Sequence, residues 1–529
     1  MGARNPAQAT ESLVETNMKN FAQNDFARNF ALASLFLSLI VPNPALAAPP
    51  VSRSLALVGG TVITATGEPP LTDATVLIEN GRIKSVGSRA SLAIPSGSEV
   101  VDVRGKFITP GLIDTNVHLV LMTVPEFFVK YEGHFEEIAI ESAQIGLKYG
   151  FTTMMDTWGP LEPLLKARDR LNRGEVIGSR VLIGGNIVGI GGPFSPYMLE
   201  GAPLHGLDFR YGGWVQPALQ KRINDLWEAN MGPRLLALTP SELADAMRQY
   251  LAKGVDFVKV AVSAHGIQPV EPLMFSVEQL RAMREEVKKA GRPFLTHTFT
   301  LESLRLAVEI DSDLLQHPNV MDPEPETPGQ IAARDALITQ IKAKNIYCAL
   351  MLIPSKEQFK ILQNWKAEEH PDDPYINQIM LNRRAGATPE IYQKRVAALR
   401  PWLDAKVPFT LATDAGIEVS ELGPVVWGRL GRYEFERMEA LQDAGASTIE
   451  ILMAATRRGA EAYGLGHDLG TVEAGKIADL LVLDADPLQD IHNFRKINMV
   501  LKDGHVIDRK SLPTVHAVDF YDPEAPWPF

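Results

Sequence analysis

The chain has one cysteine, no long run of lysine and arginine, and no hydrophobic run that reaches the length of a membrane span. A lone cysteine, Cys348, excludes an intrachain disulfide, and the apolar residues around it predict a buried, inert thiol. The 64 acidic residues outnumber the 52 basic ones, and the net charge of −12 argues against a nucleic-acid partner. The hydrophobic fraction of 45% is ordinary, so we expect a soluble globular enzyme.

Residues 1–47 are expected to be a signal peptide and not part of the fold. Lys19 and Arg28 precede an apolar run at residues 30–41, and small residues at 45–47 provide a cleavage site. An uncleaved membrane anchor is the competing interpretation, but the apolar run has about 12 residues and a bilayer span needs about 20. We therefore predict export to the periplasm or beyond, with no membrane contact after processing.

Both ends of the remaining chain have the character of short strands. Between residues 54 and 109 several apolar runs are separated by turns, and Asn80-Gly81 is a strong hairpin signal. Residues 500–507 supply another hairpin near the other end. We therefore expect a small β-sandwich domain built from residues 48–109 and 466–512, followed by an irregular tail at residues 513–529.

From residue 110 apolar strands alternate with helices, which indicates parallel β/α units. Thr239 and Ser276 are predicted to begin two of these helices, because each is followed three residues later by Glu or Gln. Eight strands are expected, at residues 112–119, 151–158, 180–188, 256–263, 293–299, 313–318, 346–352 and 409–414. The pattern predicts an α/β fold, a (β/α)8 TIM barrel over residues 110–465.

Two long segments exceed a minimal barrel. Residues 190–238 follow the third strand, and residues 354–399 follow the seventh. Loops that follow barrel strands lie on the catalytic face, so a lid or a pocket wall is favoured over a surface insertion or an oligomer contact.

Polar side chains with catalytic potential mark the carboxyl ends of five predicted strands. Asn116 and His118 lie two residues apart on the first strand, and side chains at this spacing share a face. Four more residues stand near the ends of the fourth, fifth, sixth and eighth strands: Lys259, His297, His317 and Asp414. Barrel enzymes place their active sites at this end of the strands.

The segment from Ile108 to Leu119 closely resembles the first-strand signature of the amidohydrolase superfamily of metal-dependent hydrolases. In that signature His-x-His supplies two ligands to a metal, and here the first histidine is Asn116. Residues 470–487 resemble the superfamily segment that rejoins the β-domain after the barrel. The resemblance covers nearly the whole mature chain.

The resemblance implies a site for a divalent metal, with Zn²⁺ expected as one or two ions. Its implied ligands are Asn116, His118, Lys259, His297, His317 and Asp414. Such an ion makes hydroxide available near neutral pH. Asp414 is expected to move the proton of the water to the leaving nitrogen, and His317 to polarise the carbonyl. Lys259 is expected to act in catalysis, and in the family this lysine is often carboxylated to bridge two metals.

Asn116 separates the chain from the usual pattern, since an amide oxygen is a poorer zinc donor than imidazole. The chain resembles in this respect the Asn-x-His branch of phenylurea and thiocarbamate hydrolases. We therefore expect an effectively mononuclear site, in which Lys259 is an uncarboxylated hydrogen-bond donor or a proton carrier. The alternative is that Asn116 marks an inactive protein.

Three further residues are candidate substrate contacts: His265, Trp158 and Tyr197. The expected activity is cleavage of a C–N bond in a small amide, urea or carbamate by a metal-activated water. A dipeptidase-like or N-acyl amino acid hydrolase is an alternative, although no arginine at a strand end offers to bind a carboxylate. A catalytically silent binding protein on the same fold is a third possibility. We expect a homo-oligomer.

Overall fold

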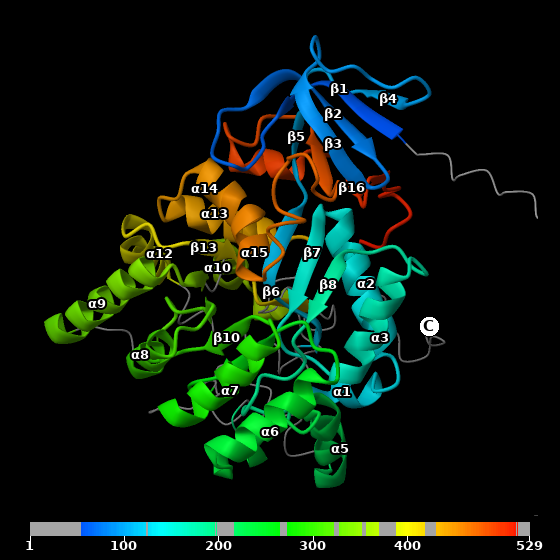
Figure 1. Cartoon of the computed structure of the whole chain (residues 1–529). Helices are drawn as coiled ribbons and strands as arrows, with labels where there is room; N and C mark the ends of the chain where they lie inside the picture. The colour runs from blue at the N-terminus through cyan, green and yellow to red at the C-terminus, as the bar shows by residue number, and fades with distance from the viewer. Residues whose placement is uncertain are drawn as a thin grey trace, which may run out of the picture. The chain divides into compact units, whose positions relative to one another are not determined.

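The computed structural model describes residues 54–122, 125–195, 197, 216–264, 272–321, 327–351, 356–369, 388–417, 430–514 and 516 (Figure 1). The predicted signal peptide, His265 and parts of both long insertions lie outside these ranges. Within them, no helix is both long enough and apolar enough to cross a membrane.

Strands from both ends of the chain form one sheet of eight strands, in the order β17-β16-β15-β5-β1-β2-β3 with β4 beside β1. Their bounds are β1 Ser54–Val62, β2 Leu71–Glu79, β3 Arg82–Ser88, β4 Glu99–Asp102, β5 Phe107–Pro110, β15 Leu480–Leu483, β16 Ile497–Lys502 and β17 His505–Val506. The central pair is β5 and β15, which run antiparallel and join residues far apart in the sequence. The sheet has its own apolar core. The two-layered sandwich stays a prediction.

The hairpin predicted at Asn80-Gly81 is confirmed, since β2 and β3 pair in antiparallel fashion with Glu79 opposite Arg82. Asn80 has φ 52° and Gly81 φ 80°, the left-handed backbone that a two-residue turn of this kind requires. The hairpin between β16 and β17 is also confirmed. It uses the same device, with φ 50° at Asp503 and 76° at Gly504.

The middle of the chain contains all eight predicted parallel strands, with β14 as a short continuation of the eighth. They are β6 Leu112–Met122, β7 Phe151–Asp156, β8 Arg180–Ile183, β9 Val258–Ala261, β10 Phe294–His297, β11 Leu314–Gln316, β12 Tyr347–Leu350, β13 Phe409–Leu411 and β14 Ala415–Ile417. They form two sheets, β14-β6-β7-β8 and β13-β12-β11-β10-β9. Val188 pairs with Val260 between them. This α/β arrangement is consistent with a TIM barrel.

Most of these strands end earlier than the apolar pattern predicts. The segments predicted at residues 180–188 and 346–352 pair only over β8 and β12, because the apolar residues beyond them are buried in loops. Ile187 and Val188 are examples, at 2% and 0% exposure. His317 and Asp414 leave the strands with φ 41° and 59°, a backbone that cannot continue a strand.

The helices are α1 Pro125–Lys130, α2 Phe135–Lys148, α3 Leu161–Asn172, α5 Pro217–Glu228, α6 Pro240–Leu251, α7 Val277–Lys289, α8 Leu301–Glu309, α9 Pro328–Lys344, α10 Lys356–Asn364, α12 Pro389–Asp404, α13 Tyr433–Asp443, α14 Thr448–Ala454 and α15 Arg457–Ala462. Capping boxes at Thr239 and Ser276 confirm the predicted starts of α6 and α7. Helices α2 and α3 lie beside β7 and β8 (Figure 1).

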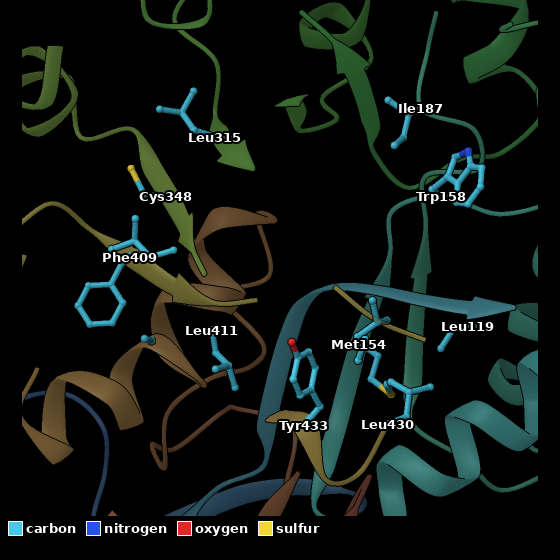
Figure 2. Close-up of a cluster of buried hydrophobic side chains, with 14 of the residues drawn as sticks. Leu119, Met154, Trp158, Ile187, Leu315, Cys348, Phe409, Leu411, Leu430 and Tyr433 are labelled. Carbon is cyan, nitrogen blue, oxygen red and sulfur yellow. The ribbon is translucent and has the colours of Figure 1, made fainter. Parts of the chain in front are cut away.

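Strand side chains and loop residues share a large apolar core. Figure 2 shows Leu119, Met154 and Leu411 among the buried side chains of this core. Cys348 on β12 belongs to it and is fully buried, as predicted. Burial raises the pKa of this thiol, which keeps it protonated and unreactive.

Candidate active site

Each of the six residues predicted as metal ligands lies at or near the carboxyl end of a parallel strand. Asn116 and His118 lie on β6, Lys259 on β9 and His297 at the end of β10, whereas His317 follows β11 and Asp414 follows β13. Five of them are buried, and the Asp414 side chain is 14% exposed. Charged and hydrogen-bonding groups in a protein interior require partners, so their contacts show which of these residues act together.

His118 and Asp414 form a direct pair, with 2.9 Å between Nε2 of the ring and Oδ1 of the carboxylate. The backbone N–H of Asp414 donates to the carbonyl of Asn116 at 2.7 Å, which ties the eighth strand to the first. Burial alone would raise the pKa of Asp414, but the charge and hydrogen bond of His118 outweigh it. With Lys259 and His317 also nearby, the pKa lies well below its usual range and the group stays ionised.

Asp114, which sequence reasoning did not select, holds this pair of strands together. Its carboxylate accepts the N–H groups of Asn116 at 3.1 Å and Thr413 at 3.2 Å, and the Thr413 hydroxyl at 2.5 Å. Thr413 directly precedes Asp414, so Asp114 sets the backbone on which Asp414 is carried. Burial raises the pKa of Asp114. An aspartate in the middle of an apolar strand was the available signal.

His297 and His317 form a second pair, with ring centroids 4.5 Å apart in an edge-on arrangement. Phe299 stacks on His317, also with a centroid separation of 4.5 Å. Nδ1 of His317 lies 3.2 Å from the carbonyl oxygen of Thr298. A carbonyl only accepts, so Nδ1 carries a proton and Nε2 is the nitrogen suited to a ligand in the neutral ring.

Lys259 is fully buried, and its Nζ donates to the hydroxyl of Thr157 at 3.2 Å. That hydroxyl in turn donates to the amide oxygen of Asn116. Burial lowers the pKa of Lys259 to about 8, against the opposing charges of Asp414 and Asp156. Lys259 therefore carries its charge at neutral pH and lies close to losing it.

Asp156, at the end of β7, is a second buried acid that sequence reasoning missed. Its Oδ2 accepts the backbone N–H of Leu119 at 2.7 Å, directly after His118. Burial raises its pKa to about 6, although the charge of His118 opposes the shift. Asp156 and Asp114 thus support the two sides of the β6 segment that carries Asn116 and His118.

The candidate substrate contacts are placed unevenly. Trp158 lies beside His118, ring edge to ring face with centroids 6.0 Å apart. Its Nε1 donates to Asn186 and to the carbonyl of Gly191, both at 3.1 Å, so this N–H is already engaged by a loop. Tyr197 is partly buried against the apolar core. His265 lies outside the described residues.

The donor chemistry fits a divalent ion. His118, His297, His317 and Asp414 offer three imidazoles and an ionised carboxylate, and Nδ1 of His118 is a buried nitrogen with no hydrogen-bond partner in the described part of the chain. The four approach as two pairs. Within the described ranges, no three His, Cys, Asp or Glu side chains are gathered closely enough to hold an ion as they stand.

Known proteins share this architecture. The model of the amidohydrolase family matches residues 107–507. The structure of molinate hydrolase is 31% identical in sequence with a TM-score of 0.76, over 90% of this chain and 99% of that one. Phenylurea hydrolase B is also 31% identical with a TM-score of 0.76, over 89% of this chain and 100% of that one.

More distant relatives extend the similarity. Imidazolonepropionase of Caulobacter vibrioides is 24% identical over 430 residues, 78% of this chain and 88% of that protein. Since the family model covers most of the chain and includes every residue of the site, the chain belongs to the amidohydrolase family and is a hydrolase that acts on C–N bonds.

Proposed function

We propose that the protein is a metal-dependent hydrolase that cleaves the C–N bond of a small amide, urea or carbamate. The observation that carries the proposal is the contact of Asp414 with His118 at 2.9 Å, together with the charges of Lys259 and His317 that help to keep this carboxylate ionised. Three basic groups around one carboxylate at a strand end are more than a fold requires. The similarity to molinate hydrolase and phenylurea hydrolase B supports this range of substrates.

In the proposed site His118, His297, His317 and Asp414 hold the ion, for which Zn²⁺ is the first candidate. A divalent ion bound there would act as a Lewis acid, polarising a carbonyl and lowering the pKa of water. Asp414 stays ionised because of its basic neighbours, so it can take up a proton and return it to the leaving nitrogen. Nδ1 of His317 is engaged by the carbonyl of Thr298, so Nε2 is the nitrogen that can serve either the ion or, when protonated, the substrate carbonyl.

A domain organisation, an export signal and an oligomeric state complete the proposed function. We propose a closed (β/α)8 barrel at residues 110–465, a β-sandwich at residues 48–109 and 466–512, and a tail at residues 513–529. Residues 1–47 direct export and are removed, and the mature protein forms a homo-oligomer. The intact mass of the native protein tests the removal of the signal peptide, and a retained segment at residues 18–47 would contradict it. The mass of the native particle in solution tests the homo-oligomer.

The activity is tested by screening the purified protein against phenylureas, carbamates, anilides and N-acyl amino acids, with metal content measured in parallel. Turnover of a urea or carbamate that a chelator abolishes and Zn²⁺ restores is the expected result. Asp414→Asn provides the matched inactive variant, since it keeps the volume of the side chain and removes its charge. Hydrolysis that persists without metal, or is confined to N-acyl amino acids, would overturn the proposal.

A further inference from the structure

A short hydrogen-bond chain crosses the site from Lys259 to Asn116. Nζ of Lys259 donates to Thr157 Oγ1 at 3.2 Å, and Thr157 Oγ1 donates to Asn116 Oδ1. Lys259 lies on β9, Asn116 on β6, and Thr157 directly follows β7; each side chain is at most 1% exposed. The backbone N–H of Thr157 donates to the carbonyl of Val117 at 3.0 Å, so the hydroxyl is fixed beside Asn116 by the main chain as well.

The chemistry of the three groups determines which atom donates in each of the two hydrogen bonds. A protonated lysine has only donors, and a hydroxyl has one hydrogen. Because the hydroxyl of Thr157 accepts from Lys259, its own hydrogen is available for Asn116, and the amide must present its oxygen. The same orientation leaves Asn116 Nδ2 buried without a hydrogen-bond partner among the described residues, so the oxygen is the atom that this arrangement serves.

We propose that Thr157 is a positioning residue that holds Lys259 in the site by connecting it to Asn116. This inference rests on the proposed function and adds a task for Asn116: its oxygen anchors the hydroxyl and is not needed by an ion. Among the described residues, Thr157 is the hydrogen-bond partner of Lys259, whose opposing charges Asp414 and Asp156 act at a distance. Within that part of the chain, removing the hydroxyl takes away the directional contact that fixes where the amine points.

The experiment compares Thr157→Val with Thr157→Ser and wild type in the metal-loaded enzyme. Valine removes the hydroxyl with little change of shape, whereas serine keeps it. We expect kcat to fall about 10–100-fold in the valine variant, as for other groups that orient a catalytic side chain. KM should stay within about 3-fold, and serine should restore kcat to within about 3-fold. Equal losses in both variants would overturn the inference.

Thr153→Val is the matched control, because Thr153 is a buried threonine on β7, the strand that Thr157 follows, and its hydroxyl accepts from Arg180 at the amino end. It should lower stability without lowering kcat. A similar loss of kcat in Thr153→Val and Thr157→Val would show that any buried hydroxyl on or just after β7 matters equally, and would overturn the specific role of Thr157.

A second comparison uses Asn116→Ala, alone and together with Thr157→Val. If the two residues act through one chain, the double variant should lose no more kcat than the worse single variant. Losses that multiply would overturn the connection. Metal content provides a measurement independent of turnover: Asn116→Ala should bind as much metal per chain as wild type, and a loss of metal would make Asn116 a ligand and overturn the inference.

These outcomes are separate from the failure of the proposed function. A wild-type protein that binds metal but hydrolyses none of the tested compounds would refute the proposed substrates. The metal content of Asn116→Ala would still decide whether the asparagine anchors a hydroxyl or holds an ion. A wild-type protein that binds no divalent metal would remove both the proposed function and this inference.

Discussion

The two ends of the parallel strands differ in how completely their polar groups are partnered. At the amino ends, Arg180 contacts both Asp479 and Asp503 at 2.6 Å. Asp256 accepts from Arg168 and from the backbone of β8, both at 2.9 Å. Around them lies a cavity of about 910 Å³ whose walls carry charges of both signs. This end is organised by ion pairs that satisfy one another.

At the carboxyl ends, buried polar atoms are left without hydrogen-bond partners in the described part of the chain. Asn116 Nδ2, His118 Nδ1 and Asp156 Oδ1 are three of them. The pKa values of Asp156 and Lys259 are shifted toward each other, to about 6 and about 8. Incomplete pairing and displaced pKa values are typical of a functional site, whereas saturated pairs are typical of structural support. The difference supports the proposed site at the carboxyl ends and a supporting role for the ion pairs at the amino ends.

The largest predicted effect is at the carboxyl end. Replacing His297 with Ala should remove bound metal and lower turnover by more than about 100-fold, because a ligand should cost more than the groups that merely orient one. Asp313→Asn is the control at the amino end, where Asp313 accepts the backbone N–H of Phe294 at 2.8 Å. The control should keep its metal. Elemental analysis decides, and full occupancy in the His297 variant would contradict the assignment.

At the amino end, Arg180→Met should cost stability and leave turnover intact. Asp479 is 4% exposed and Arg180 19%, so the change removes the arginine from a buried carboxylate that keeps the backbone N–H of Asp503 as a partner. The expected loss is about 3 kcal/mol in the free energy of unfolding, measured by urea denaturation. Lys84→Met is the matched control, since Lys84 is 62% exposed in its pair with Glu79 and the pair should contribute less than about 1 kcal/mol. A fall in kcat without a loss of stability would reverse the comparison.

Glu434 should make the free energy of unfolding depend on pH. Burial, together with the nearby Asp114 carboxyl, raises the pKa of Glu434 well above its usual range. In the unfolded chain the group loses its proton near pH 4.3, but in the folded chain it keeps it to higher pH. As the pH rises above about 4.3, loss of this proton stabilises the unfolded state relative to the folded one. The free energy of unfolding therefore falls with rising pH until the pH reaches the raised pKa of Glu434 in the folded protein.

Glu434→Gln should flatten this profile and stabilise the protein at pH 8 relative to wild type, by about 2 kcal/mol. Denaturation midpoints between pH 5 and pH 8 measure the change. Glu439→Gln, at a partly exposed ion pair with Arg495, should leave the slope as it is in wild type. A wild-type stability that rises with pH across this window would show that Glu434 is ionised in the folded protein.

The sequence predicted the eight strands, two helix starts and the strand ends that carry the site, because each leaves a local pattern. It did not predict Asp114, Asp156 or Thr157, which resemble ordinary strand residues until their partners are known. Thr157 meets Lys259 across 102 positions of sequence, and only the strand order brings them together. The predicted strand ends were too long for a related reason: a buried loop and a buried strand are equally apolar.

The smallest expected effect is in the tail, at the buried contact between His516 and Ser142. His516 is buried, and its Nε2 lies 2.7 Å from the hydroxyl of Ser142, which itself donates to the carbonyl of Leu119 at 2.7 Å. The hydroxyl has one hydrogen, so Nε2 of His516 is the donor in this chain. This series of hydrogen bonds ends at the carbonyl of Leu119, the residue after His118, so it reaches only the backbone there.

His516→Ala should therefore behave like a change at the amino end of the strands, not like one in the site. We expect a loss of about 1 kcal/mol in the free energy of unfolding and a change in kcat of at most about 3-fold. His467→Ala, a substitution at an exposed histidine, should change neither quantity. His516→Ala could instead lower kcat about 100-fold at unchanged stability. The contact would then orient His118 through the backbone, and the tail would belong with the catalytic end of the strands.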